Sequence, residues 1–235
     1  FSGDTCDPIL SGDWQHPQLL GSADIGQNNG GTDVEVVSKK AYVTANASSG
    51  SKSDFYIIDV NDPTLTNLPL INGSGLNTGP GLAAVAVFGT YAFVANMSTV
   101  AQLQVIDISV PTAPAVVASL DLTAAADTAV GNSIFYSNKK IYLGLTKSSG
   151  PELYVIDVSD PLNPTNQATF ETNTQINAIT VKNDVAYLAV PDDATSAAPE
   201  QLRTLDVSRA DTGNIIQINT FSYANPATMS GEGIY

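Results

Sequence analysis

Four aspartates at a regular spacing are the residues of this chain that first invite a chemical interpretation. They are Asp59, Asp107, Asp157 and Asp206, which lie 48, 50 and 49 residues apart. Carboxylates serve both glycoside hydrolysis and calcium binding. Each aspartate, however, ends an apolar run and precedes a turn, where a carboxylate can accept hydrogen bonds from turn N–H groups. Four separated positions also do not supply the carboxylate pair, about 5–10 Å apart, that glycosidases need. We therefore predict a structural role for the four aspartates and no catalytic residue.

Metal, cofactor and nucleophile motifs are also missing from the sequence. No acidic cluster has the Asp-x-Asp-x-Asp-Gly spacing of a calcium loop, so we predict no cofactor and name no metal site. Adventitious Ca²⁺ binding to the many acidic turns is the alternative. His16 is the only histidine and Cys6 the only cysteine, which excludes a zinc site built from several histidines and an intrachain disulfide. A Ser-His-Asp triad would depend on His16, which we expect to be a surface or packing residue.

The apolar runs that end in the four aspartates form the clearest repeat. They read Phe55-Tyr-Ile-Ile-Asp59, Leu103-Gln-Val-Ile-Asp107, Leu153-Tyr-Val-Ile-Asp157 and Leu202-Arg-Thr-Leu-Asp206. An aromatic residue lies 14 to 19 residues before each aspartate, within a second run of small and β-branched residues; these aromatics are Tyr42, Phe93, Tyr142 and Tyr187. A fixed period of about fifty residues is typical of a propeller or a solenoid.

Each repeat predicts four antiparallel strands. Two strands form a hairpin around the aromatic residue, the aspartate run is the third strand, and a proline-rich turn leads to a fourth strand at the edge. The third strand has apolar residues on both faces, because Leu153 and Val155 alternate with Tyr154 and Ile156. Neighbouring blades of a propeller cover both faces of such a strand, whereas a β-sandwich, the alternative, leaves one face wet.

The predicted fold class is therefore all-β, a β-propeller of four-stranded antiparallel blades. Its domain spans residues 17–235 and follows an N-terminal extension at 1–16. The four recognisable repeats lie at about 31–75, 80–125, 130–174 and 176–222. Residues 17–25 and 231–235 resemble the last and first strands of a fifth blade. Since the middle strands of that blade are missing, we expect the chain to continue beyond Tyr235.

The recurring Leu/Phe-x-Val/Ile-Ile-Asp-Val/Ile, followed by Ser/Asn-Asp-Pro in the better copies, resembles the LVIVD repeat over about residues 31–220. The resemblance implies a propeller in a secreted or surface protein of bacteria or archaea, and it implies no catalytic residue. The fourth copy departs from the pattern at Arg203 and Thr204, where the other copies are mostly apolar. These substitutions argue against a fully regular fourth blade.

The charge balance narrows the classes of partner. The chain has 9 basic and 23 acidic residues and a net charge of −14, which argues against nucleic acid and anionic membrane surfaces. No apolar run reaches the roughly eighteen residues of a membrane helix, so we predict no direct membrane insertion. The chain opens on Phe1, which we interpret as a processed or trimmed terminus with any targeting segment outside it.

We predict a non-catalytic extracellular or cell-surface propeller that serves as a binding, adhesion or scaffold module for an unknown protein or glycan. The alternatives are an Asp-dependent polysaccharide hydrolase or lyase, and a structural subunit of a filament or surface layer. An insertion at 191–201 is either a binding loop or a tolerated surface loop, because insertions in repeat proteins map to one face.

Overall fold

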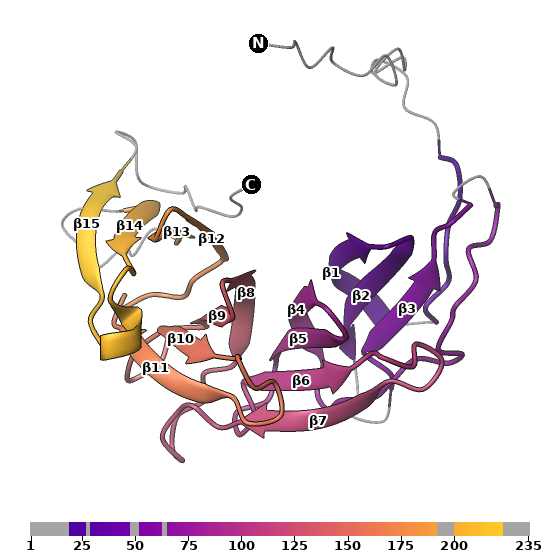
Figure 1. The fold of residues 1–235 in the computed structure, drawn as a ribbon, viewed down its shortest axis with the longest axis horizontal. Helices are drawn as coiled ribbons and strands as arrows, with labels where there is room; N and C mark the ends of the chain where they lie inside the picture. The colour runs from indigo at the N-terminus through magenta and orange to yellow at the C-terminus, as the bar shows by residue number, and fades with distance from the viewer. Residues whose placement is uncertain (1–18, 27–28, 48–51, 63–64, 192–199, 223–235) are drawn as a thin grey trace, which may run out of the picture.

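The chain folds into four antiparallel β-sheets that follow one another along an arc (Figure 1). The computed structural model describes residues 19–26, 29–47, 52–62, 65–191 and 200–222. Apart from one short 3₁₀ helix, η2 (Ala210–Thr212), the regular elements in these ranges are strands. In each sheet, strands that follow one another in the chain are neighbours, which is the arrangement of a propeller blade. The predicted all-β propeller is confirmed, and we number its blades one to four in chain order.

Blades two, three and four have four strands each. Blade two comprises β4 (Leu82–Phe88), β5 (Tyr91–Asn96), β6 (Leu103–Asp107) and β7 (Ala115–Leu120). Blade three comprises β8 (Gly131–Ser137), β9 (Lys140–Leu145), β10 (Leu153–Asp157) and β11 (Thr165–Phe170). Blade four comprises β12 (Ala178–Lys182), β13 (Val185–Ala189), β14 (Leu202–Asp206) and β15 (Ile216–Phe221).

Blade one has three regular strands, β1 (Asn29–Val37), β2 (Lys40–Ala47) and β3 (Phe55–Asp59). Its expected fourth strand is reduced to two isolated bridges, between Ile58 and Leu70 and between Phe55 and Leu76. Between them the Asn72 side chain takes the place of strand backbone. Its Oδ1 accepts from the N–H of Ile57 at 3.0 Å and its Nδ2 donates to the carbonyl of Phe55 at 3.1 Å. The outer edge of β3 is therefore satisfied without a regular strand.

Two-residue turns join the first and second strands of every blade. Both turn residues have positive φ in Ser38-Lys39, Asn138-Lys139 and Asn183-Asp184, the pattern of a type I′ turn. In blade two Gly89 takes the first position with φ 62°. These turns lie at the same end of the blades as the repeat aspartates, because Lys40 pairs with Asp59 and Lys140 with Asp157. We call this the turn end of the molecule.

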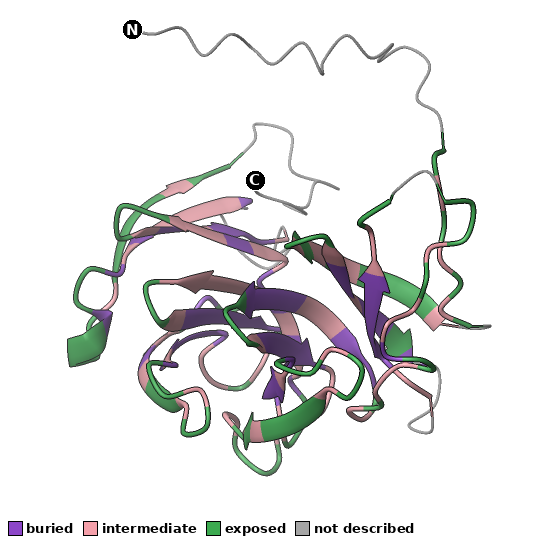
Figure 2. Ribbon diagram, turned by 45° about the vertical axis from the view of Figure 1, so that its right-hand side comes forward, coloured by how far each residue is buried: buried purple, intermediate pink, exposed green. Residues whose placement is uncertain are grey.

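Apolar side chains fill the three interfaces between successive blades. The strands that carry them are coloured as largely buried in Figure 2. Fully buried members are Phe55 and Val94 in the first interface, Leu103 and Leu143 in the second, and Leu153 and Leu188 in the third. The third strands contribute on both faces: Val155 belongs to the third interface and Ile156 to the second. Burying each such side chain contributes about 1.5–3 kcal/mol, so the arc is stabilised mainly between blades.

The segment predicted to supply the last strand of a fifth blade, residues 17–25, forms no regular strand in the part that is described, residues 19–26. A parallel bridge between Ser22 and Asn67 joins it to the outer side of blade one. The N–H of Leu68 donates to the carbonyl of Ser22 at 2.7 Å. Residues 231–235 lie outside the described ranges, so the fifth blade stays a prediction. No helix in the described ranges is long and apolar enough to cross a membrane.

Candidate functional site

Each repeat aspartate accepts a hydrogen bond from the backbone of the turn that follows it. In each case Oδ1 accepts the N–H of the residue two positions later, at 2.9 Å for Asp59, 2.8 Å for Asp107, 2.7 Å for Asp157 and 2.9 Å for Asp206. The hydroxyl and N–H of Ser109 hold the pKa of Asp107 below its usual value, and Ser208 does the same for Asp206. The N–H and hydroxyl of Ser159 lower the pKa of Asp157 in the same way. Each carboxylate is thus engaged in its own blade.

The described residues contain no group of three or more His, Cys, Asp or Glu side chains that could hold a metal ion. His16 and Cys6 lie outside these residues, as does most of the insertion at 191–201.

The repeat aromatics lie in the blade interfaces. Tyr42, Phe93 and Tyr142 are buried, and each faces the blade that follows it in the chain. Burial raises the pKa of Tyr142 to about 12, so its hydroxyl stays protonated. Tyr187 is only half-buried, because it lies on the outer face of the last blade in the arc. The structure therefore brings neither the four aspartates nor the four aromatics into one site.

A pocket of about 230 Å³ opens at the turn end, between blades two and three. We call it the aromatic pocket. It is lined by Phe88, Gly89, Thr90, Tyr91 and Phe93 from blade two, and by Tyr136, Lys139, Val158, Ser159 and Pro161 from blade three.

Three stacked rings form one side of the aromatic pocket. Tyr136 lies between Phe88 and Phe93, with ring centroids 4.4 Å and 5.9 Å away and an interplanar angle of 16° in both pairs. The N–H of Lys139 donates to the Tyr136 hydroxyl at 3.3 Å, which helps to fix the ring. Phe88 is 56% exposed, so much of its ring remains open to a ligand.

The aromatic pocket departs from the repeat at two key positions. Strand pairing places Val36, Val87 and Val181 where blade three has Tyr136. It likewise places Val37, Ser137 and Lys182 where blade two has Phe88. The other blades show that the fold does not need an aromatic ring at either position. Phe88 and Tyr136 are therefore specific to this interface and are not required by the repeat.

The opposite end of the blades carries a repeated buried polar residue that the sequence analysis missed. Asp54, Gln102, Glu152 and Gln201 each lie five residues before a repeat aspartate, and each is at most 5% exposed. The sequence does carry a signal for these residues, because a polar residue stands immediately before the apolar run in all four copies.

These side chains fasten the loop that leads to the next blade. The Asp54 carboxylate accepts from the N–H of Thr78 at 2.8 Å and from its hydroxyl at 3.0 Å. Gln102 Oε1 accepts from the N–H of Leu122 at 2.8 Å. Burial raises the pKa of Asp54 to about 6, although the hydrogen bonds from Thr78 oppose the shift.

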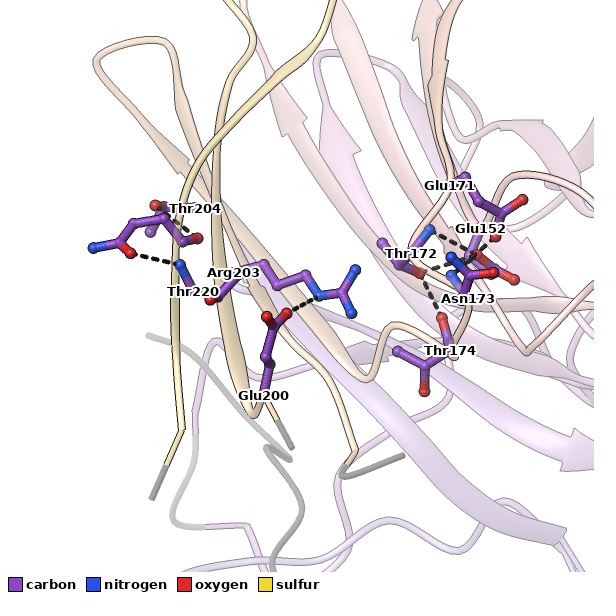
Figure 3. A network of polar contacts seen from close by, with 10 residues as sticks. Glu152, Glu171, Thr172, Asn173, Thr174, Glu200, Arg203, Thr204 and Thr220 are labelled. Carbon is purple, nitrogen blue, oxygen red and sulfur yellow. Dashed lines mark hydrogen bonds and ion pairs between the residues drawn. The ribbon is translucent and has the colours of Figure 1, made fainter. Parts of the chain in front are cut away.

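Glu152 makes the most extensive contacts of this kind (Figure 3). Its Oε2 accepts from the N–H and hydroxyl of Thr172, at 2.9 Å and 3.0 Å, and from the N–H of Asn173 at 3.0 Å. In blade four, Arg203 forms an ion pair with Glu200 at 3.0 Å, so its departure from the apolar pattern is accommodated (Figure 3). Since these carboxylates already form hydrogen bonds or an ion pair within the protein, we assign a structural role to this end of the blades, opposite the turn end.

Comparison with known proteins supports the repeat and the fold. The LVIVD repeat family model matches residues 82–121 and 149–172. These segments cover strands of blades two and three, the two blades that form the aromatic pocket. No curated protein sequence matches the chain.

Several solved structures share the fold. A periplasmic gluconolactonase of Pseudomonas aeruginosa, PpgL, superposes with a TM-score of 0.66 at 11% identity, over 84% of this chain and 55% of that one. The computationally designed Ika4 protein gives 0.53 at 12%, over 74% and 93%. A Lactobacillus plantarum protein gives 0.55 at 15%, over 83% and 57%. The chain thus spans little more than half of the two natural proteins, and identities this low show the fold alone.

Proposed function

We propose that this LVIVD-repeat β-propeller is a non-catalytic binding module that takes its ligand in the aromatic pocket. The observation that carries the proposal is the set of rings at the interface of blades two and three, at positions where the other blades have valine, serine or lysine. Ligand sites are concave, mostly apolar and equipped with a few convergent polar groups. Lys139, Thr90 and Ser159 supply such groups at this pocket.

The composition supports a site of action outside the cell or at its surface, with a protein or glycan partner. Only 14% of the residues are charged, well below the roughly 25% of an average soluble domain. The resemblance to LVIVD-repeat proteins, which are often secreted or surface-displayed, points the same way. The net charge of −14 disfavours nucleic acid as the partner.

A hydrolase or lyase that uses aspartates is less well supported. None of the ten residues that line the aromatic pocket is a carboxylate or a histidine. The repeat aspartates accept hydrogen bonds from their own turns, which stabilises their charged form in place. The propeller neighbour PpgL is a gluconolactonase, but a likeness at 11% identity does not transfer an activity.

Ligand-observed NMR with a panel of sugars, amino acids and short peptides tests the proposal. We expect at least one panel compound to bind the wild-type chain and to lose binding in Phe88→Ser. Serine is the residue that blade three has at this position, so the variant should fold. Lys182→Ser is the matched control, because Lys182 holds the same position in blade four.

Binding that survives Phe88→Ser would overturn the assignment of the site. Turnover of a polysaccharide panel by the wild-type chain, lost in Asp107→Asn or Asp157→Asn, would establish the enzymatic alternative instead.

A further inference from the structure

The aromatic pocket offers a flat apolar surface to a ligand. Phe88 and Tyr91 present aromatic rings, Tyr136 supports the Phe88 ring by stacking on it, and Pro161 adds a further apolar side chain. Aromatic faces pack well against flat apolar surfaces, such as the C–H face of a sugar ring. Because Phe88 is 56% exposed, a ligand can cover its ring without displacing the interface core.

The size of the pocket limits what it can enclose. Its volume of about 230 Å³ is below the roughly 300–1,000 Å³ of pockets that enclose drug-sized ligands. One six-membered ring with its substituents fits this space. Any longer ligand would continue into solvent beyond the turn end.

The polar groups at the pocket suit hydroxyls. Thr90 and Ser159 carry hydroxyls that both donate and accept, and the Lys139 ammonium is a donor. The backbone N–H of Lys139 holds the Tyr136 hydroxyl at 3.3 Å, which leaves that hydroxyl able to donate to a ligand. A pyranose ring presents several hydroxyls around its edge and an apolar C–H face, which matches this arrangement.

The charges near the pocket favour a neutral ligand. Lys139 and Lys140 both act on Asp157 and contribute to its lowered pKa, so the positive charge of Lys139 is partly balanced within the protein. The molecule as a whole carries a net charge of −14 and repels polyanions. A carboxylate on the ligand would therefore gain little from Lys139.

We propose that the aromatic pocket binds one neutral hexopyranose unit of a glycan, with the sugar ring stacked on the exposed ring of Phe88, which Tyr136 supports from its other face. This inference rests on the proposed binding function and names its ligand class. A neutral sugar at this position can stack on an aromatic ring and form hydrogen bonds with the hydroxyls of the pocket, and it adds no charge to the site.

Titrations followed by amide chemical shifts test this inference. The probes are methyl β-glucopyranoside, methyl β-galactopyranoside, methyl β-glucuronide and a short proline-rich peptide. We expect a neutral glycoside to shift the signals of Gly89, Lys139 and Ser159. Its dissociation constant should rise about tenfold in Tyr136→Val, because this change removes the ring that stacks on Phe88 and fixes it in place. Valine holds this position in the other three blades, so Tyr136→Val should keep the fold.

Lys139→Asn isolates the polar part of the site. Asparagine tolerates the φ of 62° at this turn position and removes the ammonium group. We expect neutral glycosides to bind a few-fold more weakly. Lys39→Asn is the matched control, because Lys39 has φ 65° at the same position of blade one, and it should leave binding unchanged.

The possible results distinguish a wrong ligand class from a wrong binding function. If the glucuronide or the peptide binds at these residues in preference to the neutral glycosides, the ligand class is wrong and the binding function stands. If none of the probes or panel compounds shifts the pocket signals at millimolar concentration, both are overturned.

Discussion

Asp54 is a carboxylate without exposed surface, next to the buried apolar residues of β3 in blade one. Loss of hydration is the largest influence on it and raises its pKa to about 6, against the hydrogen bonds from Thr78. Blades two and four have Gln102 and Gln201 at the equivalent position. The fold therefore accepts an uncharged amide where blade one has an ionisable group.

We predict that Asp54→Asn stabilises the protein at pH 7 and has little effect below pH 4. A raised pKa means that the folded state favours the protonated acid, so this stabilising effect is complete below the unfolded-state value of about 3.9 and is lost as pH rises through about 6. We expect a gain of ~1–2 kcal/mol at pH 7, less than the full linkage because the variant loses a charge-assisted hydrogen bond. Urea denaturation of both proteins at pH 4 and pH 7 measures it.

Asp107→Asn is the control, because the pKa of Asp107 is shifted in the opposite direction. Ser109 lowers the pKa of Asp107, so the stabilisation from this carboxylate is present at neutral pH and disappears as pH falls through the range below 4. Because Asp107 is partly exposed, Asp107→Asn should lose only about 0.5 kcal/mol at pH 7. A destabilised Asp54→Asn at pH 7 would show that the charge itself is needed to hold the Thr78 loop.

The start of β8 shows how closely two elements approach between blades two and three. A Cβ atom on Gly131 would lie 2.6 Å from the carbonyl oxygen of Gln102 and 2.8 Å from the backbone nitrogen of Asn96. Both neighbours are backbone atoms of blade two, so neither can turn away. Only glycine allows β8 to enter the sheet at this point.

Gly131→Ala should therefore destabilise the protein by about 1–3 kcal/mol, the usual cost of overpacking, or more if β8 shifts. Gly150→Ala is the matched control, because no atom lies within 4 Å of the added Cβ and the φ of Gly150 is not in the left-handed region. The free energy of unfolding of the two variants measures the difference. Equal stabilities would mean that the loop before β8 can move aside.

The elements were largely predictable because apolar alternation and turn residues repeat along the chain. The irregular outer edge of blade one was not predicted, because the side chain of Asn72, rather than a regular strand, supplies hydrogen bonds to β3 there. The aromatic pocket was also missed, because Phe88 and Tyr136 are far apart in sequence and meet only where two blades pack. Aligning the repeats strand by strand would have shown both residues as departures from valine, serine or lysine.

At the scale of the whole molecule, stability is distributed unevenly along the arc. Blades two and three each pack against a neighbour on both faces, through the three interblade cores. Blades one and four occupy the two ends, and each leaves apolar residues exposed to solvent. Val34 and Val36 of β1 are 56% and 62% exposed, and Ile216 and Ile218 of β15 are 51% and 56% exposed.

Repeat proteins are stabilised by contacts between nearest neighbours, so end units open more readily than central ones. We predict that amide hydrogen exchange of this chain is slowest in β5, β6, β9 and β10 and fastest in β1 and β15. Leu143→Ala, in the core between blades two and three, should cost about 2–5 kcal/mol and speed exchange in both of these blades. Uniform protection along the arc, changed everywhere alike by Leu143→Ala, would show instead that the four blades unfold as one cooperative unit.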